Sequence, residues 1–273
     1  MAAETIARKG RLGVGHAICV GSTHGRRPGP GGVAEAVPKS PGVTTDPFQQ
    51  AVREARDEAA PFAVLATVAF LALGLASLHA GWTLFQGVGW WLWLVAAAPY
   101  AMLALMLVGG LDRVPDRERR RGIVQLLLGL IVAFSVIETS LLAATLVAPS
   151  KHGVSGAQLL QSATTLWLAN VVAFGLAFWE LDCGGPVRRA LSQHRRTPDI
   201  QFPQDENPTL AQPGWSPQLL DYLYLATTNS IAFSPTDAMP LTRKTKALMA
   251  LESAISVVAV LLIAARAVNI LHV

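Results

Sequence analysis

Charged residues are scarce in this sequence. Asp, Glu, Lys and Arg make up 15% of its 273 residues, whereas about a quarter is usual in soluble proteins. Hydrophobic residues make up 52%, and the mean hydropathy is +0.40. The apolar residues are collected into runs of about 18 or more, the length that crosses a bilayer. These features exclude an ordinary soluble domain and predict a multi-pass protein embedded in the lipid bilayer.

Motifs for catalysis and metal binding are also missing. The two cysteines, Cys19 and Cys183, provide neither a disulfide framework nor a cysteine zinc site. The six histidines are scattered, and the sequence has no His-Glu-x-x-His, no Gly-x-x-x-x-Gly-Lys phosphate loop and no Gly-x-Ser-x-Gly elbow. We therefore expect no enzyme, no cofactor and no metal site. Two similar halves are not found either, which disfavours a transporter built on inverted repeats.

The apolar runs predict the fold. Five of them are long enough to form transmembrane helices of roughly 30 Å. They cover residues 61–80, 90–111, 122–147, 163–181 and 247–271. A shorter apolar stretch, 215–233, lies between the fourth and the fifth. The prediction is an all-α polytopic membrane protein with about five transmembrane helices plus one re-entrant or interfacial helix.

Composition divides the chain into four parts. Residues 1–50 are rich in Gly and Pro and lack hydrophobic periodicity, which predicts a disordered cytoplasmic tail. Residues 51–182 hold the first four transmembrane helices. Residues 183–214 form a polar cytoplasmic linker, and residues 215–273 hold the short helix and the final transmembrane helix.

Lys and Arg alternate regularly between successive loops. Arg53 and Arg56 precede the first apolar run, the first loop has no Lys or Arg, and five arginines follow the second run. Only Lys151 follows the third run, and four arginines follow the fourth. By the positive-inside rule the N-terminus is cytoplasmic and the protein lies in the cell membrane. The net charge of +4 is thus explained by topology, and we expect no nucleic-acid partner.

The short apolar stretch 215–233 begins and ends on the same side of the membrane. The next basic group, Arg243 to Lys246, also belongs to the cytoplasmic side, and Pro235 and Pro240 prevent one continuous helix into the final span. The stretch is therefore either a re-entrant hairpin or a helix at the interface. Non-helical backbone at membrane depth is tolerated only when it is buried in protein or lines a cavity.

Residues 221–242 carry a resemblance. A short apolar helix, the pair Thr227-Thr228, and Pro235 before a long final helix resemble the pore loop of the tetrameric potassium-channel superfamily. The resemblance implies an ion-conducting homo-oligomer whose ion path is lined by Thr227, Thr228, Asn229 and Ser230. Residues 229–232 replace the glycines of the family's filter, so potassium selectivity is not implied and the expected ion is a monovalent cation.

Three further segments extend the resemblance beyond the loop. Trp179–Pro186, Phe202–Gln204 and Phe233–Asp237 are similar to a family of uncharacterised bacterial multi-pass membrane proteins. This second resemblance implies a fold and no established activity. A turn and helix cap over residues 227–237 is the alternative to a pore-lining segment, because Ser, Thr and Asp beside Pro commonly end helices.

Three charged residues fall inside the predicted spans: Glu138, Glu252 and Arg266. Such charges cost several kcal/mol in hydrocarbon and usually face a cavity or a partner. Glu138 and Arg266 differ in depth by only about 5 Å on a 1.5 Å rise, which allows a buried charge pair. Glu252 shares one helix face with Ser256, Ala259 and Arg266, so this face is expected to point inward.

Glu252 is also at a depth that residues 227–229 can reach, which makes it a candidate for the ion path. A structural glutamate is the alternative. In span four, Asn170 is expected to form an interhelical hydrogen bond. Glu180 and Asp182, at the end of that span, either attract cations to a vestibule or are simply solvated.

Two functions remain open at this level. The first is an ion-conducting pore of degenerate channel type, made of several copies of the chain. The second is a non-conducting structural or accessory membrane protein whose linker 183–214 binds a partner.

The topology leads to a labelling prediction. In a chain whose Cys19 and Cys183 are replaced by Ser, a Lys151→Cys variant should react with a membrane-impermeant thiol reagent added outside intact cells. Arg119→Cys and Arg195→Cys should react only after the membrane is permeabilised. Labelling of position 151 only from the cytoplasmic side would contradict this orientation.

Overall fold

The computed structural model describes residues 46–81, 88–109, 117–147, 155–191, 197–213, 215–235 and 237–271, without the side chains of 117, 146–147 and 266–271. Most of the predicted N-terminal tail, together with Lys151 and Arg195, lies outside these ranges. The side chain of Arg266 lies outside them as well, so its pairing with Glu138 stays a prediction.

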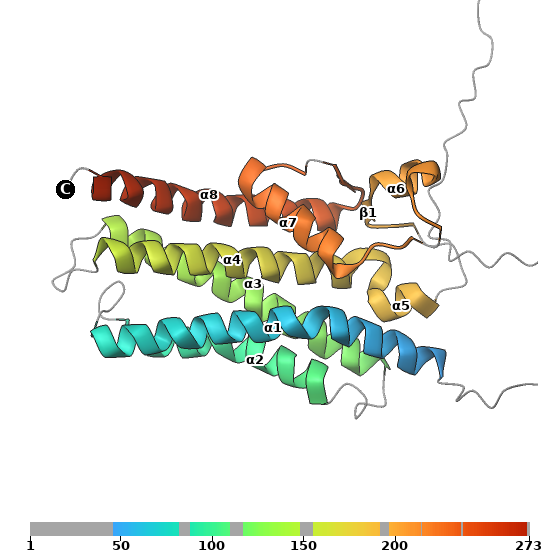
Figure 1. Cartoon of the computed structure of the whole chain (residues 1–273), viewed down its shortest axis with the longest axis horizontal. Coiled ribbons are helices and arrows are strands. Elements are labelled where there is room, and N and C mark those ends of the chain that lie inside the picture. The colour runs from blue at the N-terminus through green and yellow to red at the C-terminus, as the bar shows by residue number, and fades with distance from the viewer. Residues whose placement is uncertain are drawn as a thin grey trace, which may run out of the picture.

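Five long helices run side by side (Figure 1). They are α1 (Pro47–Ala80), α2 (Trp91–Gly109), α3 (Arg117–Val147), α4 (Gly156–Leu181) and α8 (Arg243–Leu271). In the described part of the chain these five are long and apolar enough to cross a membrane. The all-α polytopic class is therefore confirmed. The helices extend beyond the predicted spans, most clearly in α1, which is capped by Asp46 and continues through Pro61.

The side chains inside the bundle and those on its outer surface differ in kind. Small residues of α1 such as Ala59 and Ala63 are buried against α2, where Phe70 contacts the rings of Trp93 and Tyr100. Large apolar side chains point outward instead: the exposed fraction is 62% for Leu65 and 73% for Leu105. Hydrocarbon is the solvent that favours such an outer surface. The chain is an integral membrane protein.

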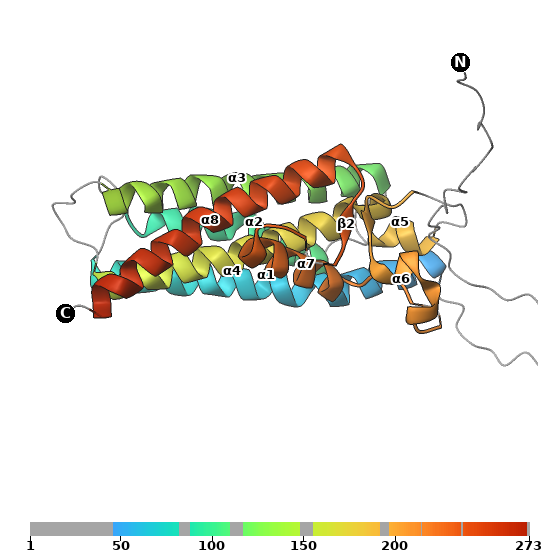
Figure 2. The ribbon, with the colours of Figure 1, turned by 90° about the horizontal axis from the view of Figure 1, so that it is seen from above.

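The short elements gather at one end of the bundle, where α1 and α8 begin (Figures 1 and 2). They are η3 (Asp182–Gly184), α5 (Pro186–Leu191), β1 (Ile200–Gln201), α6 (Pro203–Glu206), η4 (Pro208–Leu210) and β2 (Met239–Pro240). β1 pairs with β2 antiparallel, with Ile200 opposite Pro240. We call this end of the bundle the basic end, because many Arg and Lys residues lie there. They belong to the starts of α1, α3 and α8 and to α5.

The remaining helix, α7 (Leu219–Ala232), starts at the basic end and packs against α4 and α8. Its last turn reaches α8 at Glu252, nine residues or about 13 Å along that helix from Arg243. The chain then returns through β2 to the start of α8 (Figure 1). Segment 215–242 thus enters and leaves the bundle at the same end, which is the course that a re-entrant element requires.

Two contacts determine the position of α7. At its start, the Leu219 backbone N–H donates to Glu58 Oε2 of α1 at 2.9 Å. Further along, Leu223 lies directly on Gly175 of α4: a Cβ on that glycine would fall 2.6 Å from Leu223 Cδ2 and 3.2 Å from its Cα. Only glycine permits this close approach, so Gly175 sets the distance between α7 and α4.

Asp182 connects the basic end to α7. Its carboxylate is 1% exposed and accepts hydrogen bonds from the backbone N–H groups of Asp199 (2.8 Å) and Ile200 (3.1 Å). The Tyr222 hydroxyl donates to Asp182 Oδ2 at 2.6 Å, and Arg189 Nη1 lies 3.5 Å from the same oxygen. The alternatives considered for Asp182, a vestibule or a solvated carboxylate, are wrong, because these partners enclose it.

Burial, together with the Asp182 carboxylate, keeps the Tyr222 hydroxyl a donor. Burial raises the pKa of Tyr222 well above its ordinary value, and the Asp182 carboxylate adds to this rise while Arg189 opposes it. The protonated hydroxyl can therefore donate to Asp182 at any pH at which the protein is studied.

Removing this donor should loosen the basic end. Tyr222→Phe leaves a buried acceptor of Asp182 without its closest partner, and we expect a loss of about 1–3 kcal/mol in the free energy of unfolding. Reversible unfolding in detergent micelles measures it. Tyr224→Phe is the matched control, because Tyr224 lies on the same helix with 55% of its surface exposed and should change stability by less than about 0.5 kcal/mol. Equal losses in both variants would contradict the role of Asp182.

Candidate functional site

A buried polar cluster lies where α4, α7 and α8 meet. It contains Asn170 of α4, Asn229 of α7, and Glu252 and Ser256 of α8, each at most 1% exposed. Ser253 of α8 completes it at the edge. The inward orientation predicted for the face of Glu252, Ser256 and Ala259 is confirmed, since Ala259 is also 1% exposed.

The amide of Asn229 organises the cluster. Its Nδ2 donates to Glu252 Oε2 at 2.6 Å and to the Met249 carbonyl oxygen at 3.0 Å. Its Oδ1 accepts from Ser253 Oγ at 3.3 Å. All three partners belong to α8, so one side chain holds the last turn of α7 against that helix. Of residues 227–229, which were expected from their depth to lie near Glu252, Asn229 contacts it.

The second oxygen of Glu252 is unusual. Oε1 is buried and has no hydrogen-bond partner among the described residues. No Lys or Arg side chain in the described part of the chain forms an ion pair with Glu252. A carboxylate in such a place carries a large desolvation cost unless it binds a proton or a cation. Glu252 is therefore a group of the cluster that can bind a proton or a cation.

The polar row continues deeper into the bundle. Asn170 Nδ2 donates to Ser256 Oγ at 3.0 Å, which confirms the predicted interhelical hydrogen bond. Asn170 Oδ1 has no partner among the described residues. The next carbonyl, of Ala169, accepts from the Tyr100 hydroxyl of α2 at 3.0 Å. Buried polar groups thus extend from α7 through α8 and α4 to α2.

The other residues of the predicted ion path serve α7 itself. Thr227 Oγ1 donates to the Leu223 carbonyl at 2.7 Å and Thr228 Oγ1 to the Leu225 carbonyl at 3.0 Å. Ser230 Oγ donates to the Thr227 carbonyl at 2.8 Å. These three residues lie within α7, which ends at Ala232 and is capped by Phe233 with a φ of 55°. The turn that was the alternative for residues 227–237 therefore begins at Phe233, six residues after Thr227.

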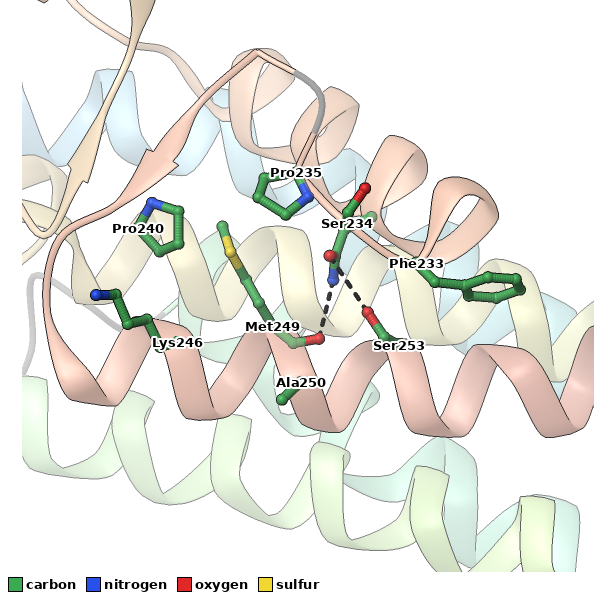
Figure 3. Close-up of a pocket in the computed structure, with 9 residues that line it drawn as sticks. Phe233, Ser234, Pro235, Pro240, Lys246, Met249, Ala250 and Ser253 are labelled. Carbon is green, nitrogen blue, oxygen red and sulfur yellow. Dashed lines mark hydrogen bonds between the residues drawn. The ribbon is translucent and has the colours of Figure 1, made fainter.

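A pocket of about 440 Å³ adjoins the cluster. Figure 3 shows Phe233, Ser234 and Pro235 on one side and α8 residues Lys246, Met249 and Ser253 on the other. Asn229, Pro240 and Ala250 also line it. Since Asn229 lies between the pocket and Glu252, a single side chain separates this space from the buried carboxylate.

Glu138 of α3 is a second buried glutamate with a free oxygen. It is 2% exposed, and its Oε1 has no hydrogen-bond partner among the described residues.

Sequence patterns alone did not reveal two features of this region. The pocket is formed by the turn after α7, and the contact of Gly175 with Leu223 depends on how α4 and α7 pack. The one available signal was a glycine within an apolar helix, which often marks a close approach. Among the described residues, no group of three or more His, Cys, Asp or Glu is arranged to hold a metal ion.

The fold and the cluster define a class, a helical integral membrane protein with a buried, singly hydrogen-bonded glutamate beside a pocket. No protein-family model, curated protein or solved structure matches the chain. The function is accordingly inferred from geometry and chemistry.

Proposed function

We propose that this protein conducts a small monovalent cation across the cell membrane, with Glu252 as the group that binds the ion. The observation that carries the proposal is the buried Glu252 Oε1, which has no partner among the described residues. Holding an uncompensated carboxylate among apolar helices costs several kcal/mol. A cation that visits this oxygen supplies the missing compensation, which explains why a glutamate stands here.

The surroundings of Glu252 favour a positive ligand. The C-terminal end of α7 lies at the cluster, three residues after Asn229. The last carbonyls of a helix carry the negative end of its dipole and attract cations within about one turn. The pocket beside Asn229 and Ser253 provides the approach from the basic end, which the positive-inside rule assigns to the cytoplasm.

The proposed path runs inside one chain. Asn229, Glu252, Ser256 and Asn170 all belong to the same bundle, so each copy of the protein holds a complete binding group. This differs from the central path between copies that the potassium-channel resemblance implies. The homo-oligomer stays an expectation that the proposal does not need.

Ion movement in liposomes tests the proposal. The purified full-length protein, reconstituted in liposomes, should collapse an imposed gradient of monovalent cations, read out with a voltage-sensitive dye. Glu252→Gln and Asn229→Leu should each slow this movement at least about tenfold, because each removes interactions of roughly 1.5–3 kcal/mol from the binding group. Expression and particle size should stay unchanged.

Glu54→Gln is the matched control. It makes the same chemical change at an exposed position of α1, and its ion movement should equal that of the unmodified protein. If the unmodified protein moves neither H⁺, Na⁺ nor K⁺, the proposal is wrong and the structural or accessory role is the remaining function.

A further inference from the structure

We infer that the ion bound at Glu252 is a proton, carried by the carboxyl group itself. The inference rests on the proposed function and names its ion. The step is one reversible reaction: Oε1 of the carboxylate accepts H⁺ to form the acid, and the O–H bond breaks again when H⁺ leaves. The other oxygen, Oε2, is already occupied by the Asn229 hydrogen bond of 2.6 Å, so Oε1 is the oxygen that takes the proton.

The donor arrangement disfavours a metal cation. A partly dehydrated cation needs several oxygen ligands around it. At Glu252 the nearest polar group is the NH₂ of Asn229, which directs its hydrogens at Oε2 and at the Met249 carbonyl. Both of these oxygens are therefore already accepting hydrogen bonds. The amide oxygen of Asn229 accepts from Ser253 instead, which leaves too few free oxygens for a metal shell.

The space around Glu252 also favours a proton over a metal cation. Glu252 is 0% exposed, and the pocket reaches only as far as Asn229 and Ser253. A sodium or potassium ion would have to displace the Asn229 side chain, whereas a proton bound to Oε1 needs no additional space.

Few charged groups surround the site. The titratable side chains described on the helices packed against α8 are Glu118, Arg119, Arg120, Arg121 and Glu138 on α3, Glu180 on α4, and Asp221, Tyr222 and Tyr224 on α7. On α8 itself, Arg243, Lys244 and Lys246 lie in the first turn, and Arg266 follows more than three turns after Glu252. None of the described groups forms an ion pair with Glu252, so its proton exchanges without a fixed counter-charge.

Hydroxyl groups continue the row beyond Glu252. Ser256 lies one turn further along α8 and is hydrogen-bonded to Asn170. The Tyr100 hydroxyl follows at the neighbouring carbonyl of α4. Serine and tyrosine hydroxyls both donate and accept hydrogen bonds.

Separate ion fluxes test the inference. Liposomes containing the full-length protein receive a gradient of H⁺, Na⁺ or K⁺, one at a time, with a large organic cation as the balancing ion. We expect flux of H⁺, read with an enclosed pH dye, and at least tenfold slower flux of Na⁺ and K⁺. Glu252→Gln should abolish the H⁺ flux, Glu252→Asp should retain part of it because it keeps a titratable carboxyl, and Glu54→Gln should leave it unchanged.

Infrared difference spectroscopy gives a second readout that does not depend on flux. Titration from alkaline to acid pH should produce the C=O band of a buried carboxylic acid, and the contribution of Glu252 to this band should be absent in Glu252→Gln and present in Glu54→Gln. Flux of Na⁺ or K⁺ without H⁺ would overturn the inference and leave the proposed function standing. Flux of H⁺ that survives in Glu252→Gln would also overturn the inference, and absence of all three fluxes would overturn both.

Discussion

The hydrogen bond between Asn229 and Glu252 is the contact on which the arrangement of the site depends. This bond of 2.6 Å joins α7, which enters the bundle from the basic end, to the apolar helix α8. It satisfies one carboxylate oxygen and directs the Asn229 amide, which in turn accepts from Ser253. Without it, both a buried amide and a buried carboxylate would lose partners, a cost that apolar packing of the same helices does not offset.

Three contacts elsewhere in the chain position α7 so that this hydrogen bond can form. Glu58 fixes the start of α7, and Gly175 allows α7 to approach α4. Asp182 binds Tyr222, which lies near the start of α7. The contacts that anchor α7 and the contact with Glu252 thus lie in different parts of this helix. The first half of α7 is held by polar contacts at the basic end, and its last turn carries the polar group that faces Glu252.

Much of the fold was predictable from the sequence because long apolar runs have few alternatives in a bilayer. The inward face of α8 was predictable too, since Glu252, Ser256 and Ala259 share one side of a helix. The burial of Asp182 was not, because its partner Tyr222 is 40 residues away. Local patterns misplaced the turn after α7 as well. Thr227, Thr228 and Ser230 suggest a helix end, but their hydroxyls bind carbonyls of α7 itself and the helix continues.

A double-mutant cycle between Asn229 and Glu252 tests the central contact most directly. The free energies of unfolding of Asn229→Ala, Glu252→Ala and the double variant are compared with that of the unmodified protein in the same micelles. A coupling of about 1–3 kcal/mol between the two positions is the predicted result, because one short buried hydrogen bond joins them. Losses that add to within about 0.5 kcal/mol would contradict the account, since the two side chains would then not be partners.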